Sequence, residues 1–279
     1  MRVYAWVWPS TLQELSAHRL LREARLFGVT DLLLLVKSVS GAVYLDTLVE
    51  ALRYARSYGV RVHAWIVCFK DLSHPDASPL DSLYRGRIIN VVSRVLDIDV
   101  DGSRVSGIHL DYVRFLRQSR QNAVLSSEVT KFVAEVRGAI DSVDPSLELT
   151  AATVAHRLSS ARDVLQVALL YGQDYLALSS IVDALMPMAY HLDVGASTRE
   201  VVESMTVLRE VLPTRIVAGI QLHPSENPGT LGRAPSLVEI REILQGLQGM
   251  DVALFRYRFL RERVDVLIAL KNVGAAGGT

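Results

Sequence analysis

The sequence alternates eight times between two kinds of segment, and this alternation is the feature that most constrains its fold. Short runs rich in β-forming residues each precede a longer stretch with apolar residues at helical spacing, as in Leu12–Phe27, Leu45–Tyr58 and Val201–Leu212. Several runs, such as 31–36, are almost continuously apolar, which is typical of strands covered on both faces in a parallel sheet. The alternation therefore predicts a (β/α)8 barrel. Its strands are expected at about 2–8, 31–37, 61–69, 106–115, 147–155, 183–190, 215–223 and 251–259.

One domain accounts for the whole length. A barrel of this class routinely takes about 250 residues, and the chain has 279, half of them hydrophobic. No composition break or linker divides it, so we expect a single barrel over residues 1–273. The Gly- and Ala-rich residues 274–279 are expected to form a flexible tail.

Composition excludes several function classes. The 30 basic and 30 acidic residues give no net charge and no basic stripe, which argues against a nucleic-acid partner. No apolar run is long enough to span a membrane, and the N-terminus lacks a signal-peptide pattern, so we expect a cytoplasmic protein. The single cysteine, Cys68, cannot form an internal disulfide. No nucleotide fingerprint occurs and no cofactor is expected. The excess of arginine over lysine suggests a thermophilic source.

Loop lengths indicate which end of the barrel carries function. The predicted helix-to-strand links are tight, as at 144–146, whereas the strand-to-helix links are longer, notably 70–81, 192–197 and 224–235. In this fold the strand-to-helix loops form the carboxyl face, where barrel active sites lie. The polar and aromatic residues at the carboxyl ends of the predicted strands are therefore the candidates for a functional site. They are Trp6 and Trp8, His63 and Trp65, His109, Asp111, Tyr112 and Arg114, His156, Tyr190, His191 and Asp193, Gln221, His223 and Glu226, and Arg256 and Arg258.

Asp111 stands out among these residues. It lies in Gly107-Ile108-His109-Leu110-Asp111-Tyr112-Val113-Arg114-Phe115, an otherwise largely apolar strand. Burying a carboxylate there is costly unless it is paired or serves chemistry. The functional interpretation makes Asp111 a catalytic group, and the structural alternative pairs it with Arg114 or another strand-end arginine.

Aromatic residues surround the same predicted mouth. Flat rings suit the apolar faces of sugars, while His and Arg side chains can bind hydroxyl groups, so the set predicts a carbohydrate site. Each ring alone is more often barrel packing, and the inference rests on the group Trp6, Trp8, Trp65, Tyr112 and Tyr190.

Four strands together resemble a family of glycoside-hydrolase-like barrels and, more distantly, chitinase-type barrels. The stretch 107–115 resembles the family's GIHLDYIRYP-like strand, and Val62-His63-Ala64-Trp65-Ile66 resembles its third strand. Asp183–Tyr190 is similar to the "MAY" strand, and Val252–Tyr257 to the closing strand. The resemblance implies a sugar-hydrolase barrel in which Asp111 is the strand-4 acid and Tyr190 lies beside the reacting sugar. The sequence departs from chitinases in having only Asp111 on strand 4 and His191 after Tyr190.

A glycosidase usually needs a second carboxyl group. Glu226 and Asp193 are the strand-end candidates, with Asp71 and Asp76 in the loop after strand 3 behind them. Glu226 is slightly favoured because its loop is long and punctuated by Pro and Gly. Ordinary solvated loop charge is the alternative for both. The predicted substrate-binding residues are Trp6, Trp8, His63, Trp65, His109, Tyr112, Arg114, Tyr190, His191, Gln221, His223 and Arg256.

Two other functions stay open. His156, His191 and His223 with Asp111 could form a metal site of a hydrolase or isomerase, although strand 1 lacks an HxH pair. A barrel that binds carbohydrate without turnover is the non-catalytic alternative. Schiff-base aldolase chemistry would need a strand-end lysine, and we expect Lys37 and Lys70 to be solvated.

Overall fold

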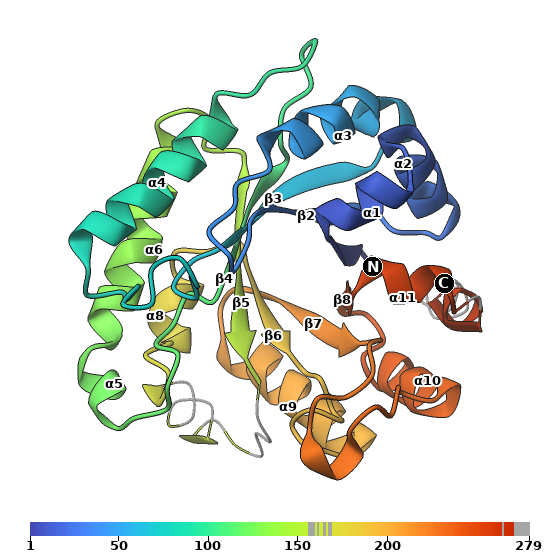
Figure 1. Cartoon of the computed structure of the whole chain (residues 1–279). Helices are drawn as coiled ribbons and strands as arrows, with labels where there is room; N and C mark the ends of the chain where they lie inside the picture. The colour runs from blue at the N-terminus through green and yellow to red at the C-terminus, as the bar shows by residue number, and fades with distance from the viewer. Residues whose placement is uncertain (156–159, 161, 164–165, 167–168, 264, 271–279) are drawn as a thin grey trace.

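The chain folds into a closed barrel of parallel strands surrounded by helices, as the sequence predicts (Figure 1). The computed structural model describes residues 1–155, 160, 162–163, 166, 169–263 and 265–270. The eight strands follow one another around the barrel in chain order. They are β1 (Val3–Val7), β2 (Asp31–Lys37), β3 (Arg61–Val67), β4 (Gly107–Asp111), β5 (Glu148–Val154), β6 (Ala184–Met188), β7 (Arg215–Gln221) and β8 (Asp251–Phe255).

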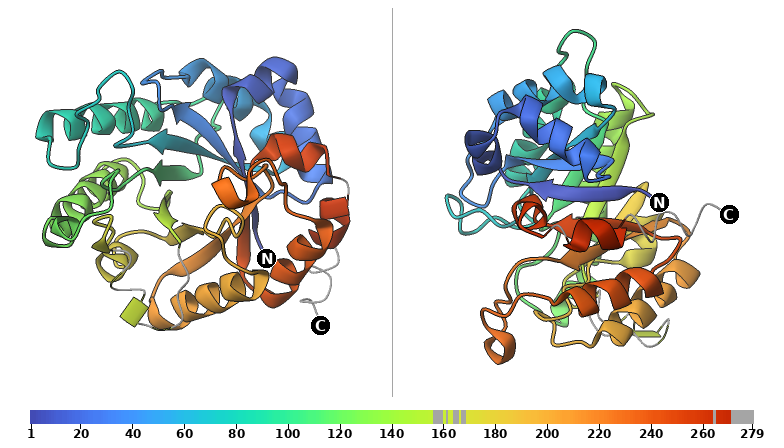
Figure 2. Two further views of the ribbon diagram at one scale, coloured as in Figure 1. Left: turned by 60° about the horizontal axis from the view of Figure 1, so that its bottom comes forward. Right: turned by 90° about the vertical axis from the view of Figure 1, so that its right-hand side faces the viewer.

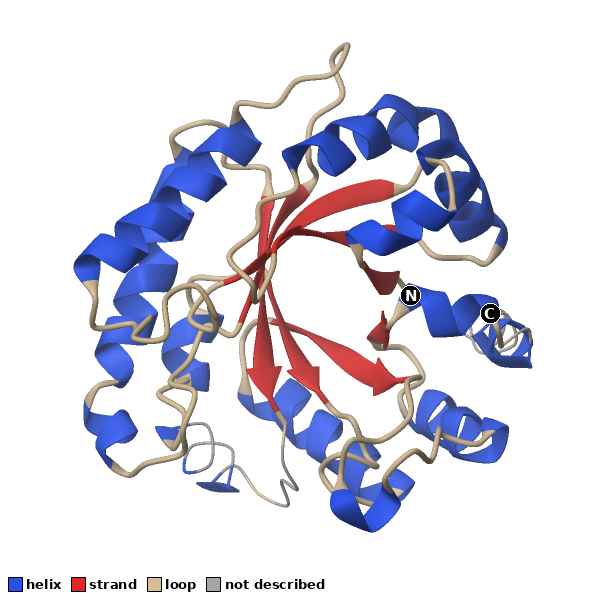
Figure 3. Cartoon of the chain, in the orientation of Figure 1, coloured by secondary structure: helices blue, strands red, loops and turns tan. Residues whose placement is uncertain are grey.

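Helices form an outer ring around the strands (Figure 3), and Figure 2 shows the same ring from two other directions. Predicted Leu45–Tyr58 is observed as a helix with those bounds, whereas predicted Leu12–Phe27 is two helices. The two are separated by extended backbone at Leu15 and Ser16, and the Ser16 side chain caps the second by accepting the N–H of Arg19. The helices are α1 (Pro9–Glu14), α2 (Ala17–Leu26), α3 (Leu45–Tyr58), α4 (Ser82–Leu96), α5 (Gln121–Val124), α6 (Ser126–Asp141), α8 (Tyr175–Ser179), α9 (Thr198–Val211), η1 (Pro228–Thr230), α10 (Leu237–Gly246) and α11 (Tyr257–Arg261).

Strand alternation divides the apolar residues between two cores. Side chains pointing outward pack against the helices and form the larger core, to which Leu34, Ile66 and Ile108 belong. Side chains pointing inward fill the barrel, and successive inward residues of one strand lie at successive depths. The inner apolar cluster consists of Tyr4, Trp6, Leu33, Leu35, Trp65, Val67, Ala184, Met186, Val217 and Ala253. Above the inner cluster, at the carboxyl ends of the strands, lies a pocket that Trp6, Trp65 and Val67 of this cluster line.

No helix within the described ranges is long and apolar enough to cross a membrane. Residues 274–279 and His156 lie outside the described residues, so the expected tail and the expected place of His156 remain predictions.

Candidate active site at the carboxyl ends of the strands

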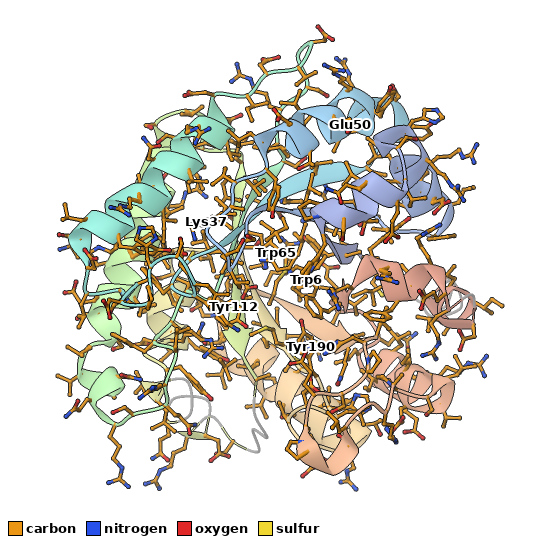
Figure 4. The ribbon with its side chains drawn as sticks, viewed as in Figure 1. Trp6, Lys37, Glu50, Trp65, Tyr112 and Tyr190 are labelled. Carbon is orange, nitrogen blue, oxygen red and sulfur yellow. The ribbon has the colours of Figure 1, made fainter. Side chains whose placement is uncertain are left out.

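A pocket of about 790 Å³ opens at the carboxyl ends of the strands. In Figure 4, Trp6, Trp65, Tyr112 and Tyr190 gather at the centre of the barrel, whereas Glu50 lies on the outer helix α3. Eleven of the predicted site residues line this pocket. They are Trp6, Trp8, Trp65, Asp111, Tyr112, Arg114, Tyr190, Asp193, His223, Glu226 and Arg256.

Asp111 is the last residue of β4 and is only 6% exposed. Each of its carboxyl oxygens accepts one hydrogen bond: Oδ1 from the backbone N–H of Tyr112 at 2.6 Å and Oδ2 from Trp65 Nε1 at 3.1 Å. These two donors fix the plane of the carboxyl group at the pocket surface. The group is therefore held rigidly where a bound molecule could meet it.

The structure does not support the alternative in which Asp111 forms an ion pair with Arg114 or another strand-end arginine. Among the residues that the structure describes, no arginine or lysine forms a salt bridge with it. Arg114 instead stacks on Tyr112 and Tyr171, with its guanidinium carbon 4.9 and 5.0 Å from the two ring centroids. Burial without a paired charge disfavours the carboxylate, and it raises the pKa of Asp111 above its ordinary value. The hydrogen bonds from Tyr112 and Trp65, and the charges of Arg114 and Lys70, oppose that shift.

The backbone changes direction directly after Asp111. Tyr112 has φ +50°, a left-handed conformation that residues other than Gly rarely adopt. β4 therefore ends at Asp111, earlier than the predicted 106–115. The turn directs the N–H of Tyr112 at Oδ1 of Asp111 and leaves the tyrosine ring on the pocket wall. Strained backbone conformations of this kind concentrate at functional sites.

Phe255, at the end of β8, joins the aromatic walls of the pocket. Its ring stacks on Tyr190 at 5.3 Å between centroids and meets the edges of Trp6 and Trp65 at 5.6 and 6.4 Å. Trp8 extends the wall from Trp65 toward the opening and is 38% exposed. The pocket therefore offers several apolar ring faces beside one buried acid.

The two candidates for a second carboxyl group differ in their environment. Asp193 is tied into the loop after β7: it accepts hydrogen bonds from Ser225 Oγ and the N–H of Glu226, each at 2.9 Å, and contacts His223 Nε2 at 3.0 Å. Glu226 is exposed on the pocket rim. Within the described part of the chain, the Glu226 carboxylate has no hydrogen-bond partner. Asp193 therefore anchors the loop that presents Glu226.

Four predicted substrate-binding residues do not reach the pocket. His63 lies at the opposite, amino end of the barrel, where its Nε2 contacts Asp31 Oδ1 at 2.8 Å. Asp31, His63 and Glu148 place ligand atoms within 4.8 Å of one another, but Arg2 binds both carboxylates. This cluster is therefore already held by an internal cation, and placing His63 at the mouth was wrong.

His109 lies inside the barrel below the pocket. It accepts the Trp6 Nε1 hydrogen bond at 3.1 Å through Nε2, and its Nδ1 contacts Thr150 Oγ1 at 2.9 Å. Burial, reinforced by His63, lowers the pKa of His109 to about 3, so the ring is neutral at ordinary pH. The expectation that His109 binds substrate is corrected: it positions Trp6.

His191 and Gln221 are also buried away from the pocket. His191 faces Glu239 of α10, with its Nε2 3.7 Å from Oε1. The Gln221 side chain accepts from the N–H of Leu192 at 3.2 Å and donates to the carbonyl of His223 at 3.3 Å. Gln221 therefore links the loops after β6 and β7, and neither residue lines the pocket, so their predicted contact with substrate is not supported.

The histidine set proposed for a metal is not assembled in the described chain. His191 does not line the pocket, and His223 Nε2 contacts Asp193. His156 lies outside the described residues.

Sequence reasoning missed several residues of the site. The pocket is also lined by Lys70, Tyr171 and Phe255. Lys70 is not fully solvated as expected, because its Nζ donates a hydrogen bond to the Tyr112 hydroxyl at 3.2 Å. Lys37 is buried on Asp71 and Tyr84, each 3.1 Å from Nζ, so the expectation that it is solvated was also wrong. The inward alternation of β8 could have found Phe255. Lys70 follows the third predicted strand but was expected to be solvated, and no sequence signal placed Tyr171.

Comparisons with known proteins identify the fold. No protein-family model and no curated protein matches the sequence. Among solved structures, a chitinase from Rhizomucor miehei shares 12% identity at a TM-score of 0.62, covering 98% of this chain and 100% of the chitinase. A class V chitinase from Cycas revoluta, solved with (GlcNAc)3, shares 13% identity at a TM-score of 0.65, covering 97% and 99%.

A β-galactosidase from Marinomonas ef1 shares 11% identity at a TM-score of 0.68. The match covers 92% of this chain and 54% of the galactosidase, so the chain spans about half the length of that enzyme. These identities establish the fold alone: the chain is a TIM barrel similar to chitinase-type barrels.

Proposed function

We propose that this protein is a glycoside hydrolase whose general acid is Asp111. The observation that carries the proposal is a buried carboxyl group without an ionic partner among the described residues, located in an aromatic pocket at the carboxyl end of β4. Barrel enzymes place catalysis at this end. The names of the structural neighbours, chitinases and a galactosidase, agree with a sugar substrate.

Asp111 has the properties that a general acid needs. Its raised pKa keeps a proton on the carboxyl group at a pH where an exposed aspartate is ionised. The donors Trp65 and Tyr112 fix the orientation of the group, so the proton can be delivered to the oxygen of the leaving sugar as the glycosidic bond breaks. Tyr190, beside Asp111 and stacked on Phe255, would contact the same sugar.

Glu226 is the proposed partner of Asp111. An exposed carboxylate without a hydrogen-bond partner in the described chain is free to act as a base toward water or as a nucleophile. Asp193 is less suited because its oxygens already hold the loop. The configuration of the released sugar, followed by NMR during hydrolysis, separates the two roles: retention requires a nucleophile, and inversion requires an activated water.

The proposal is tested with a broad panel of aryl glycosides and oligosaccharides. We expect hydrolysis of at least one sugar, a loss of roughly 100-fold or more in Asp111→Asn when the leaving group is poor, and normal activity in Glu210→Gln on the outer face of α9. Sugar binding without turnover on the whole panel would contradict the enzyme and support a carbohydrate-binding barrel. Full activity in Asp111→Asn would remove Asp111 from catalysis.

A further inference from the structure

Two cations share one aromatic ring on the pocket wall. Lys70 Nζ lies 4.7 Å from the Tyr112 ring centroid, and the guanidinium carbon of Arg114 lies 4.9 Å from the same centroid. Both side chains are partly buried and both line the pocket. They come from different elements, the loop after β3 and the turn after β4, so the fold brings two like charges together beside Asp111.

Neither cation is neutralised by the protein. In the described ranges no carboxylate forms a salt bridge with Lys70 or Arg114, and the Nε of Arg114 is buried without a hydrogen-bond partner. Holding two positive charges close together with an unsatisfied donor costs free energy, because each is partly desolvated and they repel each other. Such an arrangement is stable only at a cost, and a bound anion would offset it.

Among the described residues, no carboxyl group of the pocket is paired with these two cations. The oxygens of Asp111 accept hydrogen bonds from Trp65 and Tyr112, and burial raises the pKa of Asp111, which disfavours its ionised form. The charge of Asp193 faces His223 and the loop N–H groups. The charge of Glu226 stabilises the charged form of Arg256, on the β8 side of the pocket. Positive charge is therefore in local excess around Tyr112, although the whole chain has no net charge.

We propose that the pocket takes an acidic sugar, whose anionic group binds between Lys70 and Arg114 against Tyr112 while Asp111 protonates the leaving oxygen. The inference rests on the proposed function, because it names the substrate class of the same site. A carboxylate of a uronic acid and a sulfate ester both provide the oxygen pair that a guanidinium and an ammonium can bind together. Uncharged sugars would leave the two cations unpaired.

The test compares matched pairs of methylumbelliferyl glycosides: glucuronides with glucosides, and galactoside 6-sulfate with galactoside. Calorimetric binding of glucuronate and galacturonate oligosaccharides, and of their methyl esters, is measured on Asp111→Asn. A hydrogen bond to a charged group changes affinity by roughly ten- to a hundredfold. We therefore expect at least tenfold preference for one acidic member, weakened by salt. The preferred pair distinguishes carboxylate from sulfate.

Arg114→Met and Lys70→Met should each lower activity and affinity toward the acidic member at least tenfold more than toward the uncharged member of the same pair. Arg209→Gln, on the outer face of α9, is the cation control, and thermal melts check folding. Equal loss for both members, or a wild-type preference for uncharged sugars, would overturn the inference while leaving a glycosidase. Acidic sugars bound selectively but never cleaved would overturn the glycosidase and leave the anion site. No binding of any acidic sugar would overturn the inference.

Discussion

The hydrogen bond from Trp65 to Asp111 gives the most quantitative prediction. Trp65→Phe keeps an aromatic ring in the wall but removes the Nε1–H that Oδ2 accepts at 3.1 Å. The other donor, the N–H of Tyr112, is part of the backbone and stays. The substitution therefore removes one of two hydrogen bonds that stabilise the ionised form of Asp111.

The size of the effect follows from the energy of that bond. A hydrogen bond to a charged group contributes about 1.5–3 kcal/mol, and about 1.4 kcal/mol corresponds to one pKa unit. The neutral acid also accepts this hydrogen bond, although more weakly, so the lower end applies and we expect the pKa of Asp111 to rise by about one unit. Loss of a donor to the charged form can only raise the pKa of an acid.

The assay is the pH dependence of kcat/KM on the best aryl glycoside. Activity of a general acid falls as the pH rises through its pKa, so the alkaline limb of Trp65→Phe should lie about one pH unit higher than that of the wild type. Trp8→Phe is the matched control, because Trp8 lines the pocket without a hydrogen bond to Asp111. The KM of this variant should rise, and the alkaline limb of its pH profile should lie at the same pH as in the wild type. A limb that does not move in Trp65→Phe, or that moves to lower pH, would refute the reasoning.

Three further predictions concern stability and the loop. Asp111→Asn should have a higher melting temperature than the wild type at pH 8 and the same melting temperature at pH 4. The pKa of Asp111 is higher in the folded than in the unfolded protein, so the wild type loses stability as the pH rises from the unfolded-state pKa through the folded-state pKa, and the variant does not. Glu148→Gln at the amino end should cost roughly 1–3 kcal/mol in urea unfolding, since it weakens the contacts of two arginines, and should leave the pH profile unchanged. Asp193→Asn should speed proteolysis within 224–235, because Ser225 and the N–H of Glu226 then donate to a neutral amide oxygen instead of a carboxylate. An unchanged rate of cleavage would contradict the role of Asp193 as the anchor of this loop.

The sequence predicted the barrel because its two hydrophobic periods are strong and regular. The predicted strand ends also placed Asp111, Trp6 and Trp65 at the mouth of the barrel, where they line the pocket. Depth was harder to predict. His63 precedes Trp65 by two residues on the same inward face, and two residues correspond to about 6.6 Å along a strand. That difference separates the pocket from the amino end, and it depends on how neighbouring strands are staggered.

Loops were the second source of error. Lys70 reaches Tyr112, and Asp193 reaches Ser225, through backbone courses that no local pattern specifies. Tyr112 illustrates the same point: its positive φ follows from the way β4 ends beside the β3 loop, not from a residue type that prefers that conformation. The strands and their order were therefore predictable from local periodicity, whereas the depth of a residue along its strand and the contacts of loop residues were not.

The central claim is that Asp111 donates a proton to the leaving oxygen. Its most direct test is the rate of Asp111→Asn on a series of aryl glycosides with leaving groups of different pKa. We predict that the variant keeps much of its activity on dinitrophenyl glycosides, which need no protonation, and loses progressively more as the leaving-group pKa rises. An equal loss across the series would show that Asp111 is not the acid.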